Sequence, residues 1–218
     1  MTGWHCVFSS VPRDAVMRRG WLRAAVLAAA CAFAIEAVAQ LYATPLNDAT
    51  PPYEMNGYSV EPPRGAGWFE MQRDRQHALF GKKLPAPTHA VVATATAAQL
   101  GEPFANQREL LDYVNRMRGA QGDAARYRMG EFTAEPDASF GAWCVRYYAK
   151  SEDRGAPNAR GRALLLEHFG ITCVHPVRQD LVIDVGYSER GRPGGIDATL
   201  RNEGENFMRS LKFRPFQR

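Results

Sequence analysis

The sequence predicts an α+β domain, an antiparallel β-sheet flanked by helices, in the order four strands, helix, four strands, helix. Short runs of alternating apolar and polar residues recur between turn sequences, and two amphipathic segments have helical spacing. The strand runs come in groups rather than alternating with helices, which is not the order typical of parallel sheets. With 218 residues, 45% of them hydrophobic, the chain is long enough for one domain with a sizeable core.

The N-terminus has the three parts of a secretory signal peptide. A basic segment, residues 17–23, leads into the uncharged apolar stretch 24–35, and Ala37-Val38-Ala39 follows as a small-residue cleavage site. About a dozen apolar residues are too few to cross a ~30 Å hydrocarbon core comfortably. We therefore expect residues 1–39 to be removed after Ala39, leaving a mature chain that starts at Gln40. Residues 1–16 look like an upstream extension, which would make Met17 the true start.

Two alternatives to a cleaved leader stay open. Cys31 follows an apolar run, as the lipidated cysteine of a lipoprotein does, and the leader could also stay uncleaved as an anchor. We expect the chain in the periplasm or secreted, in a Gram-negative type of cell, soluble after cleavage or else lipid-anchored through Cys31. It would meet a membrane only if Cys31 is lipidated or the leader is uncleaved. Removing residues 1–39 takes away four arginines and two acidic residues and lowers the formal net charge from +4 to +2, which argues against nucleic-acid binding.

The segment that follows the leader, residues 40–56, should be a flexible tether. It contains Thr44-Pro45 and Thr50-Pro51-Pro52 and shows no regular period. A single domain should then span residues 57–216. Its first four strand-like runs cover residues 58–61, 68–72, 77–84 and 89–96, with turn residues between them.

Two helices are expected. The first should begin after Asn106, because an N-cap asparagine with Glu109 three residues later is a variant of the capping box, and Gly119 should end it. Its apolar stripe consists of Leu110, Leu111, Val114 and Met117. The second helix should cover residues 197–211, and Gly204 on its apolar side would let it approach the sheet closely.

The other four strand runs are residues 127–135, 140–152, 163–175 and 181–188. The middle two should pair antiparallel, and placing Cys144 opposite Cys173 makes several cross-strand pairs sensible at once. These are Tyr148 with Phe169, Lys150 with Glu167, Trp143 with Val174 and Val145 with Thr172. Since an exported chain meets an oxidising compartment, we predict a Cys144–Cys173 disulfide. Two free buried cysteines, or a metal-binding or catalytic role for them, are the alternatives.

Arginines gather at one predicted end of the sheet. Strand 163–175 runs away from loop 155–162 and strand 181–188 runs back, so loop 189–195 should lie beside loop 155–162. The five arginines of this rim are Arg154, Arg160, Arg162, Arg190 and Arg192. Glu152, Asp153 and Glu189 oppose them. The rim is either a site for an acidic partner or an anionic surface, or a solvated loop edge.

The sequence contains no G-x-S-x-G, H-E-x-x-H or P-loop pattern, so we assign no catalytic residue, no metal and no cofactor. His77 and His89 begin strands and have no partner that the sequence identifies. His168, within a strand, is expected to be a satisfied, half-buried histidine.

Two terminal motifs resemble the PsbP-like superfamily, which includes the DcrB-type bacterial envelope lipoproteins. The opening Gly57-Tyr58-Ser59-Val60-Glu61-Pro62-Pro63, followed by Gly67-Trp68, is similar to that family's G-F-x-V-x-x-P…G-W strand pair. The ending Phe207-Met208-Arg209-Ser210-Leu211-Lys212-Phe213 is similar to its F-x-x-S-L-K-F helix and exit. The resemblance covers about residues 57–216. It implies an antiparallel sheet of six or more strands between helices, used as a binding or assembly module without shared catalytic residues, and it does not explain the paired cysteines.

These observations predict an exported envelope protein that acts as a non-catalytic binding or assembly module for an unidentified envelope partner. The alternative is a periplasmic hydrolase or small-ligand-binding protein that uses the arginine-rich end of the sheet. A pocket lined by converging polar groups would favour the alternative, whereas a shallow surface with an exposed apolar patch would favour the assembly module. The sequence leaves open whether the chain is an enzyme and favours the non-catalytic interpretation.

Overall fold

The computed structural model describes residues 43–119, 123–156, 158–194 and 197–216. The expected signal peptide, the start at Met17 and the lipidation of Cys31 lie outside the described residues and stay predictions.

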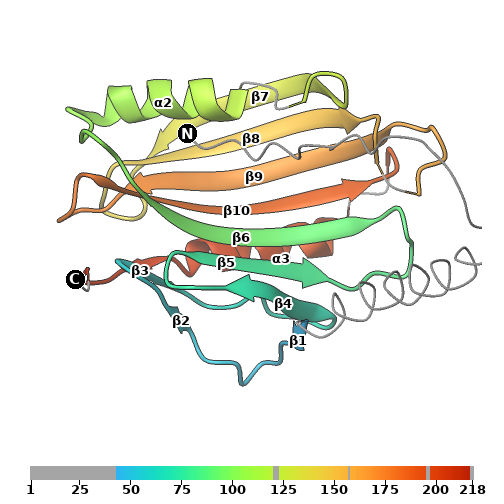
Figure 1. The fold of residues 1–218 in the computed structure, drawn as a ribbon, viewed down its shortest axis with the longest axis horizontal. Helices are drawn as coiled ribbons and strands as arrows, with labels where there is room; N and C mark the ends of the chain where they lie inside the picture. Colours follow the sequence, from blue (N-terminus) through green and yellow to red (C-terminus); the bar gives the residue numbers. More distant parts are fainter. Residues whose placement is uncertain (1–42, 120–122, 157, 195–196, 217–218) are drawn as a thin grey trace, which may run out of the picture. The chain divides into compact units, whose positions relative to one another are not determined.

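An eight-stranded antiparallel sheet is the main element of the described chain (Figure 1). Its strands run in the order β1-β4-β5-β6-β10-β9-β8-β7, and each neighbouring pair is antiparallel. In that order they are Thr44–Pro45, Trp68–Arg73, His77–Lys82, Ala90–Gln99, Leu181–Gly191, Leu164–Val174, Cys144–Asp153 and Tyr127–Asp137. A small sheet has the order β11-β3-β2, with strands Lys212–Phe213, Tyr58–Val60 and Tyr53–Glu54.

The predicted α+β class is wrong, because the described chain is mainly β. Strands take 44% of the described residues and helices 15%, in two helices, α2 (Gln107–Gly119) and α3 (Ala198–Arg209). The order of four strands, helix, four strands, helix fails because β1, β2 and β11 add three strands of two residues each. Two residues are too few to show an alternating pattern, so the sequence does not reveal these strands. The run 58–61 also joins the small sheet rather than the large one.

Residues 43–56, expected to be a flexible tether, include β1 and β2 and are packed on the domain. Tyr53 and Met55 are buried, and the Tyr53 ring centroid lies 5.5 Å from that of Phe80 in β5. The Arg73 guanidinium lies 4.4 Å above the Tyr53 ring. Burial of an aromatic side chain therefore holds this segment, although the segment itself has no periodic pattern.

The two helices pack on opposite faces of the large sheet. Leu110 and Val114 of α2 lie in one buried cluster with Val182 of β10, whereas Phe207 of α3 lies in another with Ile183. Neighbouring residues of a strand point to opposite faces, so the two clusters are on opposite sides of β10.

The predicted starts of both helices agree with the structure, whereas α3 ends at Arg209, before the predicted end at residue 211. The side-chain oxygen of Asn106 accepts a hydrogen bond from the Glu109 amide at 3.1 Å, and the Glu109 carboxylate accepts one from the Ala105 amide at 2.8 Å. In α3 the carboxylate of Asp197 accepts a hydrogen bond from the Thr199 amide at 2.7 Å. Met117, counted in the apolar stripe of α2, is instead 59% exposed.

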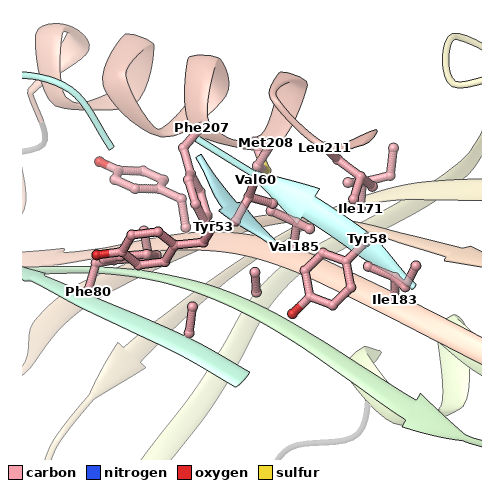
Figure 2. Close-up of a cluster of buried hydrophobic side chains, with 14 of the residues drawn as sticks. Tyr53, Tyr58, Val60, Phe80, Ile171, Ile183, Val185, Phe207, Met208 and Leu211 are labelled. Atoms are coloured by element: carbon pink, nitrogen blue, oxygen red, sulfur yellow. The ribbon is translucent and has the colours of Figure 1, made fainter. Parts of the chain in front are cut away.

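The larger core lies between the large sheet, the small sheet and α3 (Figure 2). Phe207 projects from α3 toward Tyr53 and Phe80, and its ring centroid is 5.6 Å from that of Phe80. Gly204 permits this packing as predicted, because a Cβ at that position would lie 2.4 Å from the Cγ atom of Tyr187. The helix therefore approaches β10 more closely than a larger residue would allow.

The predicted register of β8 and β9 is confirmed. Cys144 lies opposite Cys173 and the two form a disulfide, with both residues fully buried. The same register pairs Tyr148 with Phe169, Lys150 with Glu167 and Val145 with Thr172. The disulfide thus joins two neighbouring strands of the large sheet and lies in the larger core.

Candidate functional site

Three connections meet at one end of the large sheet (Figure 1). They join β5 to β6, β8 to β9 and β10 to α3. Arg190 lies opposite Ala90 and Gly191 lies opposite Leu165, so the end of β10 is beside the starts of β6 and β9. The antiparallel register thereby brings together segments that are far apart in the sequence.

These connections line a cavity of about 930 Å³. The lining residues are 86–89, 158–160, 162–164 and 192–193. Small-molecule pockets in proteins enclose about 300–1,000 Å³. The cavity is therefore large enough for an organic ligand.

Three of the five rim arginines line this cavity. They are Arg160, Arg162 and Arg192, and all three are exposed. The lining residues include no aspartate or glutamate. Within the described part of the chain, none of the three guanidinium groups is engaged in an ion pair or a hydrogen bond. The cavity wall therefore carries three positive charges that no described carboxylate neutralises.

The other two rim arginines are paired with carboxylates. Arg154 lies 3.2 Å from Glu152, and Arg190 lies 3.3 Å from Asp153. Asp153 is fully buried, and Arg126 donates to both of its oxygens at 2.9 Å. The hydrogen bonds from Arg126 hold the pKa of the Asp153 carboxyl below its usual range, so it stays charged. The contacts of Arg126 and Arg190 with Asp153 stabilise the end of β8. These paired side chains do not add unpaired charge to the cavity.

The connection between β8 and β9 has an unusual backbone. Asn158 and Arg160 have φ angles of 62° and 53°, in the left-handed region that favours glycine. Each such residue costs about 1–3 kcal/mol unless its surroundings impose the conformation. Here Ala159 is buried, and its carbonyl accepts a hydrogen bond from the Arg162 amide at 3.1 Å. Strained backbone of this kind clusters at sites that hold functional side chains.

A buried carboxylate lies behind the cavity wall. Nε2 of His89, a lining residue, is 2.6 Å from Glu189, whose side chain is 0% exposed. Glu189 also accepts hydrogen bonds from the Tyr187 hydroxyl at 2.7 Å and from the Asp197 amide at 3.0 Å. Burial raises the pKa of Tyr187 well above its usual value, so its hydroxyl remains a donor. Glu189 therefore fixes His89 and joins it to the start of α3.

Sequence reasoning missed the His89–Glu189 pair. The sequence identifies no partner for His89, and it indicates only that Glu189 opposes the rim arginines. The two residues are 100 positions apart. Only the pairing of β6 with β10 brings them together, and no local motif indicates that pairing.

His175, which lies close to Cys173 in the sequence, has a structural role. One ring nitrogen donates to the Arg214 carbonyl at 2.8 Å, and the other accepts from the Arg178 amide at 3.0 Å. Among the residues that the structure describes, no group of three or more His, Cys, Asp or Glu side chains is placed to hold a metal ion. Within the same residues, no helix has the length and apolarity needed to span a bilayer.

No family model and no curated protein match this sequence. The resemblance to the PsbP-like superfamily is thus without support from a family model. Among solved structures, the chain is similar to the crystal structure of LpqN, which is involved in cell envelope biogenesis of Mycobacterium tuberculosis. That match has a TM-score of 0.46 and 13% sequence identity, and it covers 79% of this chain and 91% of the other.

Proposed function

We propose that this chain is an exported cell-envelope protein that binds an anionic ligand in the arginine-lined cavity and catalyses no reaction on it. The observation that carries the proposal is the set of three unneutralised arginines, Arg160, Arg162 and Arg192, on one cavity wall. Guanidinium groups form strong, charge-assisted hydrogen bonds with carboxylate, sulfonate and phosphate oxygens. A cavity lined by three such groups favours ligand binding over a flat surface for assembly with a partner.

The exposed apolar residues support the same choice. In the described chain the large hydrophobic side chains that are most exposed are Met71, Met117 and Val177. They come from β4, from α2 and from the turn between β9 and β10, which are three separate elements. Scattered apolar residues are normal on a monomer surface and do not define an assembly interface.

The export part of the proposal rests on the leader pattern and on the disulfide. The full chain should therefore be expressed in a Gram-negative host and its periplasmic fraction analysed by intact-mass measurement. We expect a chain that starts at Gln40. A lipid adduct on Cys31 would show that the chain is lipid-anchored and not cleaved after Ala39. A chain with an intact leader in the cytosolic fraction would contradict export.

The binding part can be tested with 1-anilinonaphthalene-8-sulfonate, a fluorescent probe that joins a sulfonate to an apolar ring system. The variant Arg160→Gln/Arg162→Gln/Arg192→Gln should bind the probe about tenfold or more weakly than the unmodified chain, a loss of about 1.4 kcal/mol or more. The physical reason is the removal of three charged donors from one wall.

The matched control removes the same total charge elsewhere. Arg108, Arg116 and Arg209 are exposed helix residues outside the cavity, and they should be changed to glutamine together. We expect probe affinity to stay near that of the unmodified chain. Equal weakening in both triple variants would show a general charge effect and would refute ligand binding in the cavity.

A further inference from the structure

The cavity combines charge with apolar surface. Besides the arginines, its wall includes Ala86, Pro87, Leu164 and Pro193. A bare inorganic oxyanion would contact the guanidinium groups and leave this apolar surface wet. A ligand with an apolar portion next to its charge would cover both, and removing this apolar surface from water would strengthen its binding.

The number of arginines in the cavity indicates which kind of anionic group the ligand carries. Three guanidinium groups offer three forks of N–H donors, and they come from two segments, residues 160–162 and residue 192. A carboxylate has two oxygens and is saturated by one or two forks. A phosphomonoester has three terminal oxygens and a charge of about −1.5 to −2 at neutral pH, which suits three forks and a local charge of this size.

The carboxylate that contacts His89 does not line the cavity, so it does not compete with a bound anion for the three arginines. Glu189, the carboxylate closest to His89 in the site, is fully buried and satisfied by three donors, namely His89, Tyr187 and the amide of Asp197. Glu189 is not among the residues that line the cavity. The ionised side chains that the cavity wall presents to a ligand are therefore the three arginines.

We propose that the ligand of this cavity is a phosphomonoester attached to a small apolar group. This inference rests on the proposed function, because it names the class of anion that the same cavity binds. Arg160, Arg162 and Arg192 hold the terminal phosphate oxygens, and the apolar part of the wall covers the attached group. A phosphorylated soluble metabolite and a lipid with a phosphomonoester headgroup share this chemistry.

The test measures displacement of the bound fluorescent sulfonate by three competitors. Phenyl phosphate carries both the phosphomonoester and an apolar ring, phthalate carries a ring with a similar negative charge on carboxylates, and inorganic phosphate lacks the ring. We expect phenyl phosphate to displace the probe at a concentration about tenfold lower than either of the others. In the Arg160→Gln/Arg162→Gln/Arg192→Gln variant this advantage should disappear.

The outcomes separate the two proposals. If phthalate or inorganic phosphate displaces the probe as well as phenyl phosphate does, the phosphomonoester inference is overturned and anion binding stands. If probe binding does not depend on the three arginines, the proposed function itself fails. A correctly folded variant is verified by its near-ultraviolet circular dichroism, so that a loss of binding is not a loss of structure.

A second arm identifies the source of the phosphomonoester. The chain is mixed with phosphatidylcholine vesicles with and without 20 mol% phosphatidic acid, and vesicle-bound protein is collected by flotation. Flotation only with phosphatidic acid, lost in the triple variant, supports a lipid headgroup. Displacement by phenyl phosphate without flotation supports a soluble metabolite, and failure in both arms overturns the inference.

Discussion

At the scale of single residues, His168 shows how burial controls protonation. It lies in β9, and its Nε2 is 3.4 Å from the hydroxyl of Tyr147. Burial lowers the pKa of His168 to about 4, although the charge of Asp184 opposes this shift. An unfolded histidine titrates near pH ~6.5. In the folded chain at neutral pH, His168 is therefore uncharged.

This difference predicts acid sensitivity. Between pH ~6.5 and pH ~4 the unfolded chain binds a proton that the folded chain does not, so the free energy of unfolding falls as the pH falls through this window. The contribution from His168 is about 2–3 kcal/mol across the window. Urea unfolding of the unmodified chain and of His168→Gln at pH 7, 5.5 and 4 measures it, and the variant should lose less stability on acidification.

The control for this prediction is Asn202→Gln, at an exposed position of α3 that carries no titratable group. Its pH dependence should match that of the unmodified chain, because no proton-binding group is removed. If the difference between the unmodified chain and His168→Gln stays constant from pH 7 to pH 4, His168 is not the group that titrates.

Glu189 gives a second prediction at this scale. Glu189→Ala would leave the Tyr187 hydroxyl and the Asp197 amide without their acceptor. Removing one partner from a buried charged network costs about 3–5 kcal/mol. Urea unfolding of Glu189→Ala should show a loss of that order. Glu152→Ala, at a half-exposed glutamate, should lose no more than about 1 kcal/mol. Equal losses in the two variants would refute a structural role for the buried network.

At the scale of secondary-structure elements, the contact between α3 and β10 depends on Gly204. Helix propensity alone predicts that Gly204→Ala stabilises the chain by about 1 kcal/mol. The structure predicts the opposite sign, because the added Cβ would lie 2.4 Å from Tyr187 Cγ and would push α3 away from the sheet. We expect a net loss of about 1–3 kcal/mol in urea unfolding.

Gly101→Ala is the matched control. A Cβ at Gly101 would have no heavy atom within 4 Å, and the residue is outside both helices. This variant should unfold within about 0.5 kcal/mol of the unmodified chain. If Gly204→Ala is more stable than the unmodified chain, the helix propensity of alanine outweighs the steric conflict with Tyr187, and the prediction is wrong.

Elements with a long periodic pattern were predictable, and short ones were not. The β8–β9 register followed from Cys144 and Cys173, because a wrong register would have separated the aromatic and charged pairs that alternate along the same strands. The start of α2 followed from local capping at Asn106, which the structure confirms. In contrast, β2 is held by the burial of Tyr53 against β5, a contact between distant residues that no local pattern encodes. This is why the predicted order of elements lacks β2.

The candidate site was predictable only in part, for a related reason. Strand direction places the segments that follow β8 and β10 at one end of the sheet, so the arginines could be grouped from the sequence. Which of these arginines are neutralised depends on three-dimensional contacts, such as that of Arg190 with Asp153. The contribution of His89 required the pairing of β6 with β10, which joins the two halves of the chain.

At the scale of the whole described domain, the large sheet is a scaffold with a core on each face. The larger core lies under α3 and the small sheet, the smaller one lies under α2, and the cavity is at the end of the sheet where three connections meet. Functional loops on a rigid scaffold can be strained without unfolding the domain. The unusual backbone at Asn158 and Arg160 is compatible with this division.

The disulfide makes part of the stability of this fold depend on an oxidising environment. Cys144 and Cys173 close a loop with a sequence separation of 29 residues. In the chain-entropy model such a crosslink stabilises a fold by about 3–4 kcal/mol. The variant Cys144→Ala/Cys173→Ala should lose about that much free energy of unfolding, and the unmodified chain measured in reductant should lose a similar amount. Alkylation followed by intact-mass measurement should find no free thiol at these positions in unreduced protein from the periplasm. Two alkylated thiols there would contradict the disulfide, and with it the claim that this fold depends on an oxidising compartment for part of its stability.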